Sequence, residues 1–247
     1  MSEPAASSPA ADDDMTRLSG WDALLDDLFG LNVRAIRSIG VAVARPDRLF
    51  EAARDADWLG RYTPSLRLVF TLIAATSVLK FLWAGDDSPL VRSIVDYLAD
   101  VPLSDLPVPN VEETARRLMA QFLLLFPFTY FFCHFISSLL LRIWGKGTPA
   151  PVRIRLYFAA LLPAIAFGLV QSLFYGLIPV EWIDLATLGS GIAGVAIYLI
   201  TAFAGLAPRM KAGGRIWRAM LFALVALTTD LVISMLTYVL AFLSMYL

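Results

Sequence analysis

Few residues in this sequence could take part in chemistry, and they are spread along the chain. His134 is the single histidine and Cys133 the single cysteine, which excludes a disulfide framework and a zinc site built from several such ligands. Successive side chains on a helix point about 100° apart, so these two neighbours cannot hold one ion. The sequence therefore predicts no metal and no cofactor, and it favours His134 as a buried histidine that packs between helices.

Two other patterns suggest enzyme chemistry and do not fit it. Residues 145–148 (GKGT) resemble part of a phosphate-binding loop, but the upstream glycine is missing. Ser190 could pair with His134 in an intramembrane protease. Counting residues along their apolar segments puts the two about 15 Å apart in depth, whereas a hydrogen bond needs about 3 Å. The sequence thus predicts a protein without catalytic activity.

The elements that must position these residues are apolar segments long enough to cross a bilayer. Hydrophobic residues make up 58% of the chain and charged residues 17%, against about 25% charged in soluble domains. Because a crossing helix takes about 20 apolar residues, we predict an all-α integral membrane protein. Its transmembrane domain, residues 65–247, should be a five-helix bundle. The spans are expected at about 66–84, 118–141, 156–178, 185–206 and 217–245.

The distribution of charge predicts the orientation. Of the 20 Lys and Arg, 16 lie in residues 1–67 and in the turns that follow the second and fourth spans. Basic loops stay on the cytoplasmic side, so the N-terminus is expected in the cytoplasm and the C-terminus outside, and the Ala- and Arg-rich composition suggests a bacterial inner membrane. The same turns are expected to contact anionic lipid headgroups. The candidate contacts are Arg142, Lys146, Arg153, Arg155, Arg209, Lys211 and Arg215.

The segment before the first span predicts short helices. Residues 1–19 hold little to bury and are expected to be disordered. Residues 20–64 should form amphipathic helices over about 21–29, along the stripe Val33, Ile36, Ile39 and Val43, and from Pro46 to about Trp58. Such helices suit the membrane interface or a cap on the ends of the spans. Between the first two spans we expect another short helix, and then a restart at Asn110 or Val111.

Lys80 and Asp230 are the two charges inside the predicted spans. Either one costs about 2.5–3.5 kcal/mol near the membrane centre. Counted from Arg67 and Arg218, both lie about 18–20 Å into the membrane, so spans one and five are expected to be neighbours whose charges pair directly or through water. Alternatively, Lys80 reaches the outer headgroups, and a protonated Asp230 bonds to Gln171, Tyr130 or a neighbouring carbonyl. The candidate intramembrane polar site comprises Lys80, Asp230, Gln171, Tyr130 and His134.

Two patterns of small and polar residues predict how the last two spans pack. In span four, Ala186, Ser190 and Gly194 recur every four residues, and this spacing favours close helix packing. In span five, one face is expected to point into the bundle while bulky residues lie off it. The inward face consists of Ala223, Leu227, Asp230, Ser234, Thr237 and Ala241, and the residues off it are Phe222, Leu231 and Phe242.

From about Arg45 onward the chain resembles the Yip (Ypt-interacting protein) family of polytopic membrane proteins. The resemblance lies in ARPDRLFEAARDADW before the first span, in WGKGTPAPVRIRLYFAALLPAIAFGL around the third, and in WRAMLFALVALTTD at the last. It implies five helices with the N-terminus inside. The motif Asp-Leu-Tyr-Gly-Pro of eukaryotic members is not kept, and residues 27–31 (DLFGL) are a partial echo. The Rab GTPase binding of those members is therefore not carried over.

Together these features predict a multi-pass membrane protein that acts through protein partners, self-association or lipids in membrane organisation, with no nucleic acid partner. An alternative is a small transporter or channel-like protein that uses Lys80, Asp230 and Gln171. A third hypothesis is an intramembrane enzyme.

Overall fold

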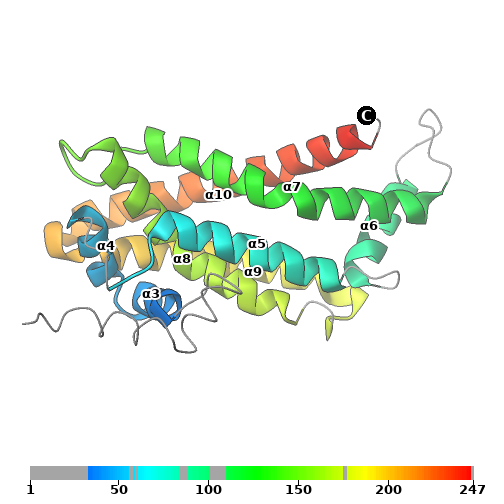
Figure 1. The fold of residues 1–247 in the computed structure, drawn as a ribbon, viewed down its shortest axis with the longest axis horizontal. Coiled ribbons are helices and arrows are strands. Elements are labelled where there is room, and N and C mark those ends of the chain that lie inside the picture. The colour runs from blue at the N-terminus through cyan, green and yellow to red at the C-terminus, as the bar shows by residue number, and fades with distance from the viewer. Residues whose placement is uncertain are drawn as a thin grey trace, which may run out of the picture.

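The computed structural model describes residues 33–55, 58, 61–83, 88–100, 110–174 and 177–245. The tail predicted at 1–19, the helix predicted at 21–29 and the motif echo at 27–31 lie outside these residues. The helices, labelled as in Figure 1, are α3 (Val33–Ala44), α4 (Pro46–Asp55), α5 (Ser65–Trp83), α6 (Pro89–Asp100), α7 (Val111–Leu140), α8 (Ala150–Ser172), α9 (Ile183–Gly205) and α10 (Ala212–Ser244), with short 3₁₀ turns at Val180–Trp182 and Ala207–Arg209.

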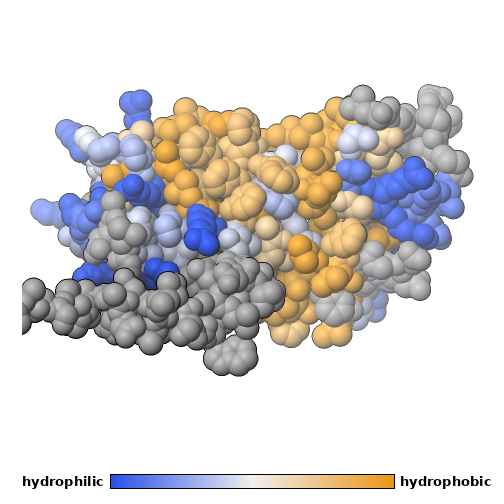
Figure 2. Space-filling view, in the orientation of Figure 1, coloured by the Kyte–Doolittle hydropathy of each residue, from blue (hydrophilic) through white to orange (hydrophobic). Residues whose placement is uncertain are grey.

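Five helices, α5 and α7–α10, are long and apolar enough to cross a membrane. They run roughly along the long axis of the molecule (Figure 1), and Figure 2 shows an apolar belt between two hydrophilic ends. The prediction of an all-α five-helix membrane bundle is thus confirmed. The described residues contain no strand. The helix bounds differ most at α7, which begins seven residues before the expected span, and at α8, which ends at Ser172 instead of near 178.

The order of helices around the bundle corrects one expectation. The most extensive contacts join α7 to α10, α5 to α8, and α9 to α10. Spans one and five, which are α5 and α10, are not close neighbours, because α7, α8 and α9 pack between them. The number of residues from a basic anchor predicts how deep Lys80 and Asp230 lie along the bundle axis. It does not predict which helices lie side by side around that axis.

Helices α3 and α4 close one end of the bundle, which we call the basic end. It comprises residues 33–55, 58 and 61–64, which we call the head, together with the turns at 141–149 and 206–211. Helix α4 buries Leu49 and Phe50 completely against α8 and α9. The Phe50 ring packs edge-on against Trp144, with 5.7 Å between ring centroids. Arg54 donates a hydrogen bond to the Trp144 carbonyl at 3.0 Å. The predicted cap on the ends of the spans is therefore present.

In a cap surrounded by water, the apolar stripe of α3 would face the protein. In this structure the small residues of α3 face the protein instead. Ala35, Ser38 and Ala42 are completely buried, and α3 packs against α8 and α4. Three large apolar residues of the stripe, Val33, Ile36 and Val43, point away from the protein, whereas Ile39 is partly buried and packs against the core. Val33, Ile36 and Val43 are 52%, 62% and 61% exposed.

The other end of the bundle has a small core of its own. Val91, Ile94 and Leu98 of α6 pack against the first half of α7 and against Ala241 of α10. Asn110 caps α7 as expected, since its side-chain oxygen accepts hydrogen bonds from the amides of Glu112 and Glu113 at 2.9 and 3.4 Å. The predicted restart of the helix at this point is confirmed.

The packing faces of α9 and α10 are only partly as predicted. On α10, Ala223, Thr237 and Ala241 are buried and Leu231 is exposed, as expected, but Phe222 is also completely buried. Because α10 packs against both α7 and α9, its buried face is wider than one stripe. On α9, a Cβ at Gly189 or Gly194 would meet nothing within 4 Å. At these two glycines, α9 therefore does not make the close approach to another helix that the spacing of its small residues favours.

An ion pair at the basic end predicts a small acid-dependent loss of stability. Arg209 donates two 3.0 Å hydrogen bonds to the Glu51 carboxylate, and they lower the pKa of Glu51 even though partial burial raises it. Stability from this pair is present above the unfolded-state pKa of about 4.3 and is lost as the pH falls through the lower folded-state value. Both side chains are partly exposed, so we expect less than about 1 kcal/mol. Thermal unfolding of the wild type and Glu51→Gln at pH 7 and pH 3 should show a difference at pH 7 only.

Candidate functional site

A chain of hydrogen bonds inside the bundle connects four helices around Asp230 of α10. The Asp230 carboxylate lies 3.0 Å from His134 Nε2 of α7, and it accepts a 2.9 Å hydrogen bond from the Tyr198 hydroxyl of α9. The other nitrogen of the imidazole, Nδ1, lies 3.0 Å from the Tyr157 hydroxyl of α8. His134 and Tyr157 are completely buried. Each of the four polar groups therefore has a partner in an apolar setting, where an unpaired polar group would be costly.

The interface between α7 and α10 carries two further hydrogen bonds on either side of this chain. The hydroxyls of Thr129 and Thr237 lie 2.6 Å apart, and those of Ser137 and Thr229 lie 2.8 Å apart. The ring of Tyr130 packs on His134 with 4.3 Å between centroids. Small polar side chains commonly join helices within membranes in this way. They hold His134 and Asp230 at a fixed separation.

The direction of the hydrogen bonds follows from the chemistry of each group. A carboxylate only accepts, so His134 donates Nε2–H to Asp230, and a neutral imidazole then leaves Nδ1 as the acceptor for the Tyr157 O–H. A proton added at Nδ1 would produce an imidazolium that donates at both nitrogens, and the Tyr157 hydroxyl would have to turn away.

A cavity of about 200 Å³ opens beside Asp230 in the centre of the bundle. At about 30 Å³ per molecule, it has room for roughly six waters or one small solute. The Asp230 side chain is 32% exposed, so lone pairs not used by His134 and Tyr198 remain accessible. All five long helices contribute polar side chains to the wall. These are Thr76, Lys80, Tyr130, Gln171, Tyr198 and Asp230.

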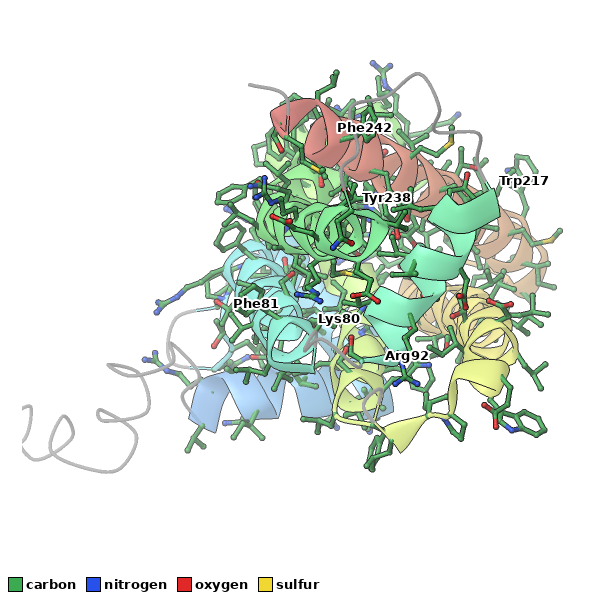
Figure 3. All side chains as sticks on the ribbon, turned by 90° about the vertical axis from the view of Figure 1, so that its right-hand side faces the viewer. Lys80, Phe81, Arg92, Trp217, Tyr238 and Phe242 are labelled. Carbon is green, nitrogen blue, oxygen red and sulfur yellow. The ribbon has the colours of Figure 1, made fainter. Side chains whose placement is uncertain are left out.

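Lys80 lies on the inner side of α5 in the wall of this cavity. The next residue, Phe81, points outward and is 58% exposed. Figure 3, viewed along the bundle, shows Lys80 on the side of α5 that faces the other helices and Phe81 on the outer side. Lys80 and Asp230 thus share one cavity although their helices are not close neighbours. A bond between them, direct or through water, stays a prediction.

The structure brings all five residues of the predicted polar site into one region. Asp230 and His134 are bonded directly, and Tyr130, Lys80 and Gln171 line or contact the cavity beside them. Gln171 is hydrogen-bonded to Ser190, so it is not bonded to Asp230 as one alternative supposed. The Ser190 hydroxyl donates to the Ala186 carbonyl at 2.5 Å and also contacts the side chain of Gln171.

No family model matches this chain, and neither does any curated protein or solved structure. The resemblance to Yip proteins therefore stays a prediction that rests on the sequence motifs alone. Within the described ranges, no three His, Cys, Asp or Glu side chains are grouped so that they could hold a metal ion.

Sequence reasoning missed two members of the site, Tyr157 and Tyr198. A usable signal was present, because a tyrosine hydroxyl inside an apolar span needs a partner when it is buried. Counted from the basic anchors Arg142, Arg209 and Arg218, residues His134, Tyr198 and Asp230 lie about 12, 16 and 18 Å into the membrane. The same depth argument that was applied to Lys80 and Asp230 would thus have grouped these three.

The predicted lipid contacts at the basic end divide into two sets. Arg142, Lys146 and Lys211 are exposed in the turns between helices. The guanidinium of Arg153 donates to the Leu139 carbonyl at 2.9 Å, and that of Arg215 lies 4.2 Å from the centroid of the Phe203 ring. Arg155 is half-buried, and Arg209 binds Glu51. Arg153, Arg209 and Arg215 therefore make contacts within the protein itself.

Proposed function

We propose that this multi-pass membrane protein is a small transporter or channel-like protein that binds a proton at the His134–Asp230 pair, with the central cavity as the access route. The observation that carries the proposal is the cavity of about 200 Å³, to which all five long helices contribute polar side chains and in which a carboxylate is partly exposed. Ionisable residues inside a membrane commonly mark ion pathways and proton relays. A purely structural clasp would not need a cavity beside the carboxylate.

The geometry supports a simple cycle for the proton. Water in the cavity would deliver a proton to the Asp230 carboxylate, because His134 Nε2 already carries a proton and cannot accept another. Protonation would weaken the two hydrogen bonds that the carboxylate accepts, and it would so couple the event to α7 through His134 and to α9 through Tyr198. The titratable groups that face the pair come from all five long helices. They are Lys80, Tyr130, Tyr157 and Tyr198 around His134 and Asp230.

Proton flux in liposomes tests the proposal. The purified protein is reconstituted with a pH-sensitive dye inside, and a potassium diffusion potential drives protons inward. We expect flux above that of empty liposomes for the wild type and for the control Ser234→Ala, whose hydroxyl contacts only the Asp230 carbonyl. We expect Asp230→Asn to reduce the flux to the level of empty liposomes. Equal flux in the wild type and Asp230→Asn would refute the proposal.

A second candidate function is the one that the sequence favours first: a non-catalytic protein that acts through lipids or protein partners in membrane organisation, as the Yip resemblance would imply. The exposed residues Arg142, Lys146 and Lys211 support a lipid contact, since basic residues attract anionic headgroups. We also propose, from the charge distribution, that the basic end faces the cytoplasm of a bacterium.

The lipid contact predicts a change in co-purified lipid. Replacing Arg142, Lys146 and Lys211 by Gln removes three exposed charges, each contributing about 1 kcal/mol near an anionic surface. Mass spectrometry of the purified triple variant should then show less anionic lipid per protein than the wild type. The matched control is Arg116→Gln with Arg117→Gln at the other end of the bundle, where the arginines bind Glu112 and Glu113. Equal losses in both variants would mean that the basic turns have no special role.

A further inference from the structure

Helix α3 lies across the bundle at the level where the first span begins. The hydroxyl oxygen of Ser38, near the middle of α3, accepts a hydrogen bond from the backbone amide of Thr63 at 2.8 Å. Two residues later α5 starts at Ser65, whose hydroxyl donates to the Arg155 carbonyl of α8 at 3.0 Å. Figures 1 and 3 show α3 crossing the long axis of the bundle. The helix is therefore roughly perpendicular to the long axis of the bundle, at the level of the first residues of α5.

The two faces of α3 are both adapted to apolar surroundings. The inner face is small and completely buried against the protein, through Ala35, Ser38 and Ala42. The outer face carries Val33, Ile36 and Val43, each more than half exposed. Exposed apolar side chains that are grouped on one face need a covering partner or a lipid environment.

Helix α4, the next helix of the head, has the residue distribution that is typical of a helix facing water. Its apolar residues Leu49, Phe50 and Ala53 are completely buried, while Arg48 is exposed and Glu51 forms a surface ion pair. The two helices are joined by Arg45 alone, yet only α3 exposes large apolar side chains. Among the described residues of the head, Val33, Ile36 and Val43 are the exposed large hydrophobics.

The charges of α3 suit an anionic lipid surface. The helix contains Arg34 and Arg37 and no acidic residue, and the Arg37 guanidinium lies 5.9 Å from the centroid of the Tyr62 ring. An amphipathic helix with an apolar face and basic flanks lies in the plane of the membrane, with its apolar face among the upper acyl chains. Since α5 is one of the five helices long and apolar enough to cross a membrane and begins at this level, lipid would surround the exposed face of α3 without any further partner.

We infer that α3 is an in-plane helix seated in the lipid leaflet at the basic end, with Val33, Ile36 and Val43 among the acyl chains and Arg34 and Arg37 at anionic headgroups. This inference does not depend on proton binding at Asp230. It assigns α3 the role of fixing the depth of the basic end, because the same helix is bonded to the start of α5.

Spin-label accessibility tests the position of α3. In a full-length Cys133→Ala background, a nitroxide is placed at Ile36→Cys or, as the matched control on α4, at Arg48→Cys, and the protein is reconstituted in vesicles of phosphatidylcholine and phosphatidylglycerol. We expect the label at 36 to collide more with oxygen than with a water-soluble nickel chelate, and the label at 48 to show the reverse ratio. A label at 36 that favours the nickel chelate would place the face in water, and shielding from both reagents would mean a protein cover. Either result overturns the inference.

The lipid composition tests the role of the two arginines. Vesicles of phosphatidylcholine alone should reduce the preference of the label at 36 for oxygen, because the anionic headgroups are missing. Adding Arg34→Gln and Arg37→Gln should remove this dependence on phosphatidylglycerol. Far-ultraviolet circular dichroism of each variant shows whether the fold is kept. An unchanged dependence on phosphatidylglycerol in the double arginine variant would contradict the headgroup contact.

Discussion

Replacing His134 by leucine should lower the free energy of unfolding by about 2–3 kcal/mol, because it removes two hydrogen bonds inside the bundle, one to the Asp230 carboxylate and one to the Tyr157 hydroxyl. The Asp230 carboxylate would keep only the hydrogen bond from Tyr198, and the Tyr157 hydroxyl would lose its bond to the imidazole. Single hydrogen bonds between membrane helices average only about 0.6 kcal/mol. The bond to the Asp230 carboxylate should contribute more than this average, because a hydrogen bond to a charged group is stronger than one between neutral groups. Thermal unfolding in detergent, followed by circular dichroism, measures the change.

A double-mutant cycle separates the bond from the loss of packing. In an Asp230→Leu background no carboxylate remains to accept a hydrogen bond from His134. There His134→Leu should lower the free energy of unfolding by less than about 1 kcal/mol. Ser137→Ala is the matched control, since it removes a neutral hydrogen bond across the same pair of helices and should cost about 0.6 kcal/mol. If His134→Leu costs the same in both backgrounds, His134 and Asp230 are not coupled.

The sequence predicted the number and type of the long helices well because the bilayer imposes a strong constraint. A chain that crosses it must satisfy its own backbone hydrogen bonds, and about 20 apolar residues are needed each time. The exact ends were less visible. Leu173 and Phe174 continue the apolar run past the end of α8, so hydropathy extended this span beyond Ser172. Asn110, by contrast, marked its helix start correctly through a local hydrogen bond that follows from residue type.

The candidate site was predictable in its membership and much less in its bonds. Polar residues within spans are few, so Lys80, Asp230, Gln171, Tyr130 and His134 could be selected by composition, and they do gather in one region. Which of them touch depends on the order of helices around the bundle, and that order is determined by side-chain packing between distant segments. The partner of Asp230 proved to be His134 because α10 packs along α7.

The same dependence on packing explains why the tightest glycine was missed. Spacing favoured Gly194 in the middle of α9 as a point of close packing, but an added Cβ there would meet nothing within 4 Å. The close approach lies at the last residue of the helix, Gly205, over the Phe50 ring of α4. Its partner comes from a segment about 150 residues earlier in the chain. No pattern within α9 itself could indicate that contact.

Gly205→Ala should therefore destabilise the docking of the head at the basic end. An ideal Cβ at this position would lie 2.5 Å from Cε2 of Phe50, and the ring is held by complete burial and by its contact with Trp144. Alanine favours a helix over glycine by up to about 1 kcal/mol, whereas overpacking costs about 1–3 kcal/mol. Because the ring has little space to move, the overpacking should prevail, and the melting temperature in detergent should fall.

Gly194→Ala is the matched control on the same helix, since its added methyl group meets nothing within 4 Å. It should leave the melting temperature unchanged or raise it. A second-site change identifies the clash: Phe50→Leu removes the edge of the ring that the new methyl group would strike, so Gly205→Ala should cost less in the Phe50→Leu background than in the wild type. Equal melting temperatures for Gly205→Ala and Gly194→Ala would show that the head does not pack on α9 as closely as 2.5 Å implies. The head would then have room to shift at this contact, and the depth of α3 would depend on its packing against α8 and on the bond between Ser38 and Thr63.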